Sequence, residues 1–127
     1  MSFYRTQYDP RVGLGGRITP GVQALIIANV AVFVVQVLAS RATGGGIEPY
    51  LGLKPARVYP DFWIWQLVTY MFLHATNWLT HLLLNMLMLW MFGTEIERKW
   101  GTRKFVRYYL VCGVGAAFTT IVLSFLP

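Results

Sequence analysis

Three long apolar stretches divide the chain, and each has the length of a membrane-spanning helix. The first, Val22 to Ala39, is 18 residues without a charge and has three polar interruptions, Gln23, Asn29 and Gln36. At a rise of about 1.5 Å per residue, this stretch and its flanking turn cross a hydrocarbon core of about 30 Å. The pattern predicts a transmembrane helix over about residues 21–40, begun by Thr19-Pro20 because proline suits the first helical turn.

The segment before this helix, residues 1–20, is polar and rich in glycine, and it predicts a flexible cytoplasmic arm. A cleaved signal peptide is the alternative for the first apolar stretch, because Val37-Leu38-Ala39 resembles a small-residue cleavage site. The apolar region of a signal peptide is shorter, about 7–15 residues, and lies nearer the N-terminus. The pattern therefore favours a retained helix.

Two further helices are predicted, over about residues 77–98 and 104–126. Asn77 suits the N-cap of the second helix, and Gly101 is placed to end it in a short charged turn. The third helix contains Tyr108 to Leu126, which are 19 residues without a charge. The expected fold class is therefore an all-α polytopic membrane protein with three transmembrane helices.

The connection over about residues 41–76 is too long for a simple turn and too apolar for disorder. Glycines and prolines preclude a continuous helix in its first part: Gly44, Gly45, Gly46, Pro49, Pro55 and Pro60. Aromatic side chains fill its second half: Tyr59, Phe62, Trp63, Trp65, Tyr70 and Phe72. Because Trp and Tyr favour the membrane–water interface, we expect this loop to lie at the headgroup layer.

Composition and charge support a protein of the lipid bilayer with a single domain. Of the 127 residues, 56% are hydrophobic and 13% charged, against about 25% charged in soluble domains. The net charge of +6 does not indicate nucleic acid, because the basic residues flank apolar runs. Eight lie on the side of the N-terminus and three in the long loop, which predicts a cytoplasmic N-terminus. The expected location is a bacterial inner (plasma) membrane. The eight are Arg5, Arg11, Arg17, Arg98, Lys99, Arg103, Lys104 and Arg107, and the three are Arg41, Lys54 and Arg57.

Cys112 is the single cysteine, so no internal disulfide exists. Its apolar surroundings predict a small buried hydrophobe rather than a reactive thiol. Small residues follow it at spacings that allow close helix contact: Gly113, Gly115, Ala116 and Ala117.

His81 and Asn85 are the residues whose chemistry is most informative. Four apart on a helix, their side chains share one face, and in lipid such a pair should face the bundle interior or a water-filled cavity. Polar residues of this kind also join transmembrane helices by hydrogen bonds of about 0.6–2 kcal/mol, and spacing alone favours that role. A metal site is disfavoured, because no acidic or thiol ligand accompanies His81 and His74 at ligand spacing. Asn77 is expected to break the helix between the two histidines.

Three ordered blocks around this pair closely resemble the rhomboid family. They are Trp65 to His74, then His81-Leu82-Leu83-Leu84-Asn85, then Gly93 to Gly101 with its Gly-x-x-x-Glu-x-x-x-Gly pattern. The resemblance extends over roughly residues 20–126 and implies a six-helix intramembrane serine protease that cleaves transmembrane proteins without a metal or cofactor. Residues 21–127 would form the first half of that fold.

The resemblance assigns His81 and Asn85 to stabilisation of the oxyanion of the tetrahedral intermediate. It gives Glu97, Gly101 and Trp65 structural roles, although Glu97 could equally be a solvated charge at a helix end. The pair Trp65-Gln66 departs from the Trp-Arg of some members, so a role of that arginine does not carry over.

The nucleophile and base of the family are missing from these 127 residues. No serine lies in a Gly-x-Ser motif, and both histidines are already assigned, so no Ser–His dyad forms and the chain alone should be inactive. Three hypotheses follow: an N-terminal fragment of an active rhomboid, a non-catalytic rhomboid-like protein that binds transmembrane helices, or an unrelated three-span scaffold or transporter subunit. Retention of His81 and Asn85 favours the first.

Overall fold

The computed structural model describes residues 16–76 and 79–127, and within these ranges the chain contains helices and no β-strand. Three helical segments are long and apolar enough to cross a membrane: Pro20–Thr43, Leu79–Trp100 and Thr102–Ser124. The predicted all-α membrane protein with three spans is therefore confirmed. The arm predicted for residues 1–20 lies mostly outside the described residues, and the N-cap predicted at Asn77 lies wholly outside them.

The second span is built from three consecutive pieces. Helix α5 (Leu79–Met88) continues through a π-helical turn, η2 (Leu89–Gly93), into α6 (Thr94–Trp100). Gly101 follows with φ 82°, in the left-handed region that glycine adopts at little cost. The chain turns there and enters α7 (Thr102–Ser124), which starts two residues before the predicted position.

The first span, α1 (Pro20–Thr43), continues three residues past the predicted end and stops at Gly44, which has φ 72°. The connection after it is partly helical, because proline in the first turn suits the start of a short helix. Its elements are α2 (Glu48–Leu51), α3 (Pro55–Val58), α4 (Gln66–Thr69) and the 3₁₀ turn η1 (Tyr70–Phe72).

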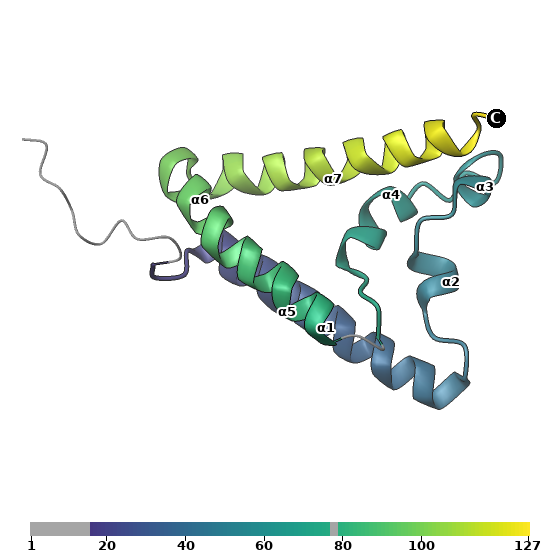
Figure 1. The fold of residues 1–127 in the computed structure, drawn as a ribbon, viewed down its shortest axis with the longest axis horizontal. Helices are drawn as coiled ribbons and strands as arrows, with labels where there is room; N and C mark the ends of the chain where they lie inside the picture. The colour runs from purple at the N-terminus through teal and green to yellow at the C-terminus, as the bar shows by residue number, and fades with distance from the viewer. Residues whose placement is uncertain (1–15, 77–78) are drawn as a thin grey trace, which may run out of the picture.

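The long helices meet at one corner and spread apart from it. Helix α6 lies at this corner, where the N-terminal ends of α1 and α7 come together (Figure 1). The short helices α2, α3 and α4 occupy the opposite side, between the far ends of α1 and α7 (Figure 1). Helices α3 and α4 contact α7. Just beyond α3 and α7, Tyr59 and Phe125 form an edge-on pair with ring centroids 6.5 Å apart, which also attaches the loop to this end of α7.

The hydrophobic core is small and lies beside the corner. Val22, Leu25 and Phe105 are buried together, and partly buried side chains of α1, η1, η2, α6 and α7 pack around them. Gly93 allows this approach, because a Cβ there would come within 3.0 Å of the Val22 side chain and 3.1 Å of the Phe105 ring. The core therefore fixes how α1, α7 and the second span meet.

Most other large apolar side chains point outward, as lipid or a protein partner requires. The prediction that Cys112 is buried is wrong, because its side chain is exposed on α7 beside an apolar groove. No described helix covers that side of α7 at Cys112, whereas Phe105 and Ala117 on the same helix are buried.

Candidate functional site

His81 and Asn85 lie on the first two turns of α5, four residues apart, and both side chains are exposed. No hydrogen bond joins either side chain to another residue of the described ranges. Asn85 lines a cavity of about 290 Å³ between α5, α1, α7 and the loop that ends at His74. The expected position beside a cavity therefore applies to Asn85, whereas His81 does not line the cavity and lies next to the His74 ring.

The cavity has a polar lining within an otherwise apolar bundle. Polar side chains reach it from four segments, and apolar ones complete the wall: Asn29, His74, Asn85 and Tyr109 with Met71, Met86 and Leu89. Asn29 is 1% exposed and donates from Nδ2 to the Leu25 carbonyl oxygen at 2.7 Å. Its amide oxygen remains an acceptor for a molecule in the cavity.

His74 is a member of this site that the spacing argument separated from His81. Its ring centroid lies 5.9 Å from that of His81, and its Nδ1 lies 3.1 Å from the Phe72 carbonyl oxygen. Burial lowers the pKa of His74 below its ordinary value of 6.5, because the charged imidazolium loses its hydration there. His74 therefore enters the site as a neutral imidazole at neutral pH.

Gln36 of α1 holds the His74 backbone in place. Its side-chain oxygen accepts from the His74 N–H at 2.9 Å, and its Nε2 donates to the His74 carbonyl oxygen at 3.0 Å. The same Nε2 donates to Glu48 at 2.9 Å. Gln36 is fully buried. Its side-chain amide therefore satisfies the backbone N–H and C=O groups of His74, which have no β-strand or helix partner in this loop.

A second buried glutamine, Gln66, does the same for the start of the loop. It accepts from the Lys54 N–H at 3.0 Å and donates to the Tyr50 carbonyl oxygen at 3.1 Å. Trp65 donates to the same Tyr50 oxygen at 3.0 Å, and Thr69 donates to the Leu51 carbonyl oxygen at 2.6 Å. These four bonds attach α4 to the end of α2, so Gln66 acts as a structural amide at this position.

Sequence reasoning missed the roles of Asn29 and Gln36, although a signal was present. The two residues are seven apart, which places them on one face of a helix. Val22 and Leu25 share that face and are also buried, whereas Gln23 points elsewhere and is exposed. Asn29 and Gln36, two of the three polar residues of the first span, thus lie on the side of α1 that faces the site.

Glu97 lies in the corner, away from the cavity, and is 3% exposed. Its carboxylate accepts from the Gly21 N–H at 2.7 Å, the Val22 N–H at 2.9 Å, the Thr19 hydroxyl at 2.5 Å and the Thr102 hydroxyl at 2.6 Å. The first turn of α1 has no acidic residue of its own, and the side chain of its N-cap, Thr19, makes no capping bond to the N–H groups of the helix. Glu97 therefore supplies from α6 the negative charge and the acceptors that the α1 N-terminus needs.

Among residues 16–76 and 79–127, no three His, Cys, Asp or Glu side chains come together as metal ligands. The arrangement offers hydrogen-bond donors and acceptors around a small cavity. Such a site can hold water or orient a carbonyl group, since amide and imidazole N–H groups both donate.

Comparison with known proteins gives one family match and two similar relatives. The family model for the Rhomboid domain matches residues 61–126, just over half of the 127 residues. Rhomboid-like protease 3 of Toxoplasma gondii is 32% identical over 98 residues, which cover 72% of this chain and 35% of that protein. Rhomboid protease GluP of Bacillus subtilis (strain 168) is 36% identical over 63 residues, covering 50% of this chain and 12% of that protein.

The chain thus spans about a third of the first relative and about an eighth of the second. No solved structure matches it. The matched region begins in the loop before α4 and runs through α7, so it contains His74, His81, Asn85 and Glu97.

Proposed function

Because the chain belongs to the rhomboid family, we propose that it forms the oxyanion-binding half of an intramembrane serine endopeptidase that cleaves transmembrane proteins. Membership of the family excludes the unrelated scaffold or transporter subunit. The observation that carries the proposal is the family's His-x-x-x-Asn spacing at a polar-lined cavity in an apolar bundle.

In the proposed reaction, the substrate carbonyl enters the cavity with its oxygen toward α5. A serine attacks the carbonyl carbon, and the developing oxyanion accepts hydrogen bonds from the Asn85 amide and the His81 ring. Neither side chain makes a hydrogen bond to another described residue, so neither must break one within these ranges to donate. Donors held on a helix in a site of low dielectric strengthen as charge develops, and each contributes about 10²–10³ to the rate.

A second segment must supply the serine and its base, because these 127 residues contain no Gly-x-Ser and no third histidine. The coding sequence after codon 127 tests this requirement directly. A Gly-x-Ser within the next ~60 codons, about the length of two further spans and their loops, would support the proposal. A stop codon followed by an unrelated gene would contradict it.

The catalytic assignment is tested in a chimera. The segment of the Toxoplasma gondii protease that aligns with this chain is replaced by the corresponding segment of this chain, and cleavage of a transmembrane reporter that the parent protease cuts is measured. The chimera should cleave the reporter. Asn85→Ala and His81→Ala should each lower the rate by about 10²–10³.

Leu83→Ala is the matched control, because Leu83 is an exposed residue of the same helix without a donor. It should leave the rate within a few-fold of the unmutated chimera. Equal rates for Asn85→Ala and Leu83→Ala in protein of equal abundance would contradict the assignment. The 127-residue chain alone should not react with a serine-directed fluorophosphonate, and specific labelling would show that a nucleophile had been overlooked.

A non-catalytic protein that binds transmembrane helices is the second candidate, and one feature favours it. An exposed apolar groove of about 400 Å³ lies between η1, the second span and α7, and its lining includes Met71, Met88, Phe92 and Cys112. Its two methionine side chains are flexible and can adapt to different helices. A chimera that folds and stays inactive, while a photo-crosslinker at Phe92 captures a transmembrane helix, would favour this candidate over the protease.

The proposed location is a bacterial inner (plasma) membrane with the N-terminus in the cytoplasm. The asymmetry of eight basic residues against three supports this orientation. The corner around Glu97 would then lie at the cytoplasmic surface, and the loop of α2 to α4 at the outer one.

A further inference from the structure

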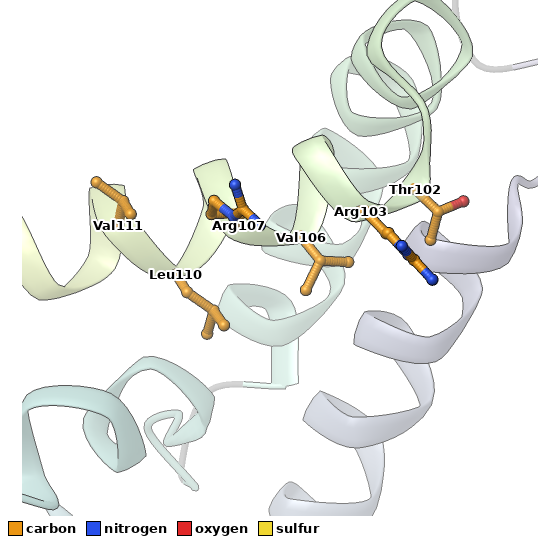
Figure 2. Close-up of a pocket in the computed structure, with 6 residues that line it drawn as sticks. All are labelled: Thr102, Arg103, Val106, Arg107, Leu110 and Val111. Atoms are coloured by element: carbon orange, nitrogen blue, oxygen red, sulfur yellow. The ribbon is translucent and has the colours of Figure 1, made fainter.

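A groove on α7 combines positive charge at one end with an apolar floor at the other. It measures about 530 Å³ and is lined by one face of the helix: Thr102, Arg103, Val106, Arg107, Leu110 and Val111. Figure 2 shows Arg103, Val106 and Leu110 along one margin, with Arg107 and Val111 along the other. We call this feature the α7 groove.

The charges of the α7 groove are unneutralised within the described ranges. Arg103 and Arg107 are exposed, and the two ion pairs of the described residues, Arg57–Asp61 and Arg98–Glu95, involve neither of them. Glu97, the nearest buried carboxylate along the chain, is already engaged by four donors. Helix α7 itself contains no acidic residue, so two guanidinium groups one turn apart face the groove without a counter-charge.

The rest of the groove suits a hydrocarbon chain. Val106, Leu110 and Val111 form its floor, and a second hollow of about 390 Å³ extends it along α7 past Val114 and Gly115. From Arg103 to Gly115 the helix rises about 18 Å, at about 1.5 Å per residue. That distance is of the order of one leaflet of the hydrocarbon core.

The depth of the arginines in the bilayer fits a headgroup phosphate. Trp100 and Tyr108 form an edge-on pair with ring centroids 5.2 Å apart at the same end of α7. Tryptophan and tyrosine prefer the headgroup level of a membrane. The aromatic pair thus brackets Arg103 and Arg107 and places them where lipid phosphates lie.

We propose that the α7 groove binds one anionic phospholipid, with its phosphate between Arg103 and Arg107 and one acyl chain along Val106 to Gly115. Guanidinium groups bind phosphate through paired hydrogen bonds. Basic pockets beside transmembrane helices are known to hold anionic headgroups. The apolar floor selects a lipid over free phosphate, and this inference does not depend on catalysis by the chain.

Native mass spectrometry of the full chain, released from nanodiscs of mixed phosphatidylglycerol and phosphatidylcholine, tests the proposal. We expect one retained phosphatidylglycerol per chain, and at least a tenfold lower retained fraction in the Arg103→Gln/Arg107→Gln double variant. The matched control is Lys99→Gln/Lys104→Gln, which removes the same charge from residues that do not line the groove. Equal loss in both double variants would show general surface attraction and overturn the proposal, as would retention without preference between the two lipids.

A second variant tests the apolar floor without changing charge. Val111 is 63% exposed, so Val111→Trp should fold normally and fill the groove, and it should reduce phosphatidylglycerol retention several-fold. Val122→Trp, near the other end of α7, is the control and should leave retention unchanged. Unchanged retention in Val111→Trp, or capture of a protein helix by a photo-crosslinker at Leu110 in place of lipid, would contradict the proposal.

Discussion

Two polar sites lie in this apolar bundle, and their hydrogen bonding is opposite. At the corner, the Glu97 carboxylate is 3% exposed and accepts four hydrogen bonds from α1 and α7. At the cavity, the side chains of His81 and Asn85 are exposed and have no hydrogen bond to another described residue. A buried carboxylate whose hydrogen bonds are all formed holds helices together. An exposed side chain without such a bond is free to form one with a ligand.

Replacing Glu97 should have the largest effect on stability. Glu97→Ala leaves two backbone N–H groups and two hydroxyls without their acceptor in a buried site, so we expect the free energy of unfolding to fall by about 3–5 kcal/mol. Unfolding of the chain in mixed micelles, followed by circular dichroism during SDS titration, measures this change.

Glu95→Ala is the control for that experiment. Glu95 makes one ion pair with Arg98 at 2.9 Å and is partly exposed, so its loss should cost less than about 1 kcal/mol. If the two variants lose similar free energies of unfolding, then Glu97 stabilises the fold no more than an ordinary surface charge does.

Gln36→Leu should have the next largest effect, about 2 kcal/mol, because it removes both bonds that hold the His74 backbone. Hydrogen exchange of the His74 amide should quicken more than that of the amides in α5. Gln23→Leu is the matched control on the same helix, since Gln23 is exposed. If His74 exchange stays unchanged in Gln36→Leu, then Gln36 does not fix the site.

Asn85→Leu should barely change stability, by less than about 0.5 kcal/mol, because Asn85 is exposed and loses no hydrogen bond to a described residue. In the chimera, by contrast, replacing Asn85 should lower the cleavage rate by about 10²–10³. A loss of stability comparable to that of Glu97→Ala would show instead that Asn85 joins helices, which is the role that its spacing alone favoured.

The smallest effect is a pH dependence centred on His74. Its folded pKa lies below its ordinary value of 6.5, so the unfolded chain binds more protons and stability falls as pH drops below about 6.5. The groups around it are the His81 ring and, through Gln36, the Glu48 carboxylate. His74→Gln should flatten the stability profile between about pH 6.5 and the folded pKa, and an unchanged slope would show that other groups dominate.

The sequence predicted the spans well because length and charge distribution determine them. The three apolar stretches gave the helices, and their ends were displaced by only a few residues at Gly44 and Gly101. Short helices α2 to α4 were not predicted, because single turns depend on distant bonds such as those from Gln66 to Lys54 and Tyr50. Cys112 was predicted as buried because its neighbours are apolar, but in a membrane protein apolar surroundings do not distinguish a core from a lipid-facing surface.

The candidate site could be predicted only in part. The spacing of His81 and Asn85 is visible in the sequence, since both lie on one helix. The approach of His74 to His81 is not, because it depends on Gln36, which is 38 residues from His74 along the chain. Three of the four bonds of Glu97 likewise join residues 75 to 78 positions apart, and no local pattern encodes such a partner.

The corner also imposes an order on biosynthesis. The acceptor of the α1 N-terminus is Glu97, which is 76 residues downstream of Gly21, so this cap cannot form until Glu97 has been translated. At about 5–20 residues per second, roughly 4–15 s of translation separate the two. During that interval the first N–H groups of α1 depend on water or lipid headgroups. The bonds between Glu97 and the start of α1 can therefore form only after α6 has been synthesised.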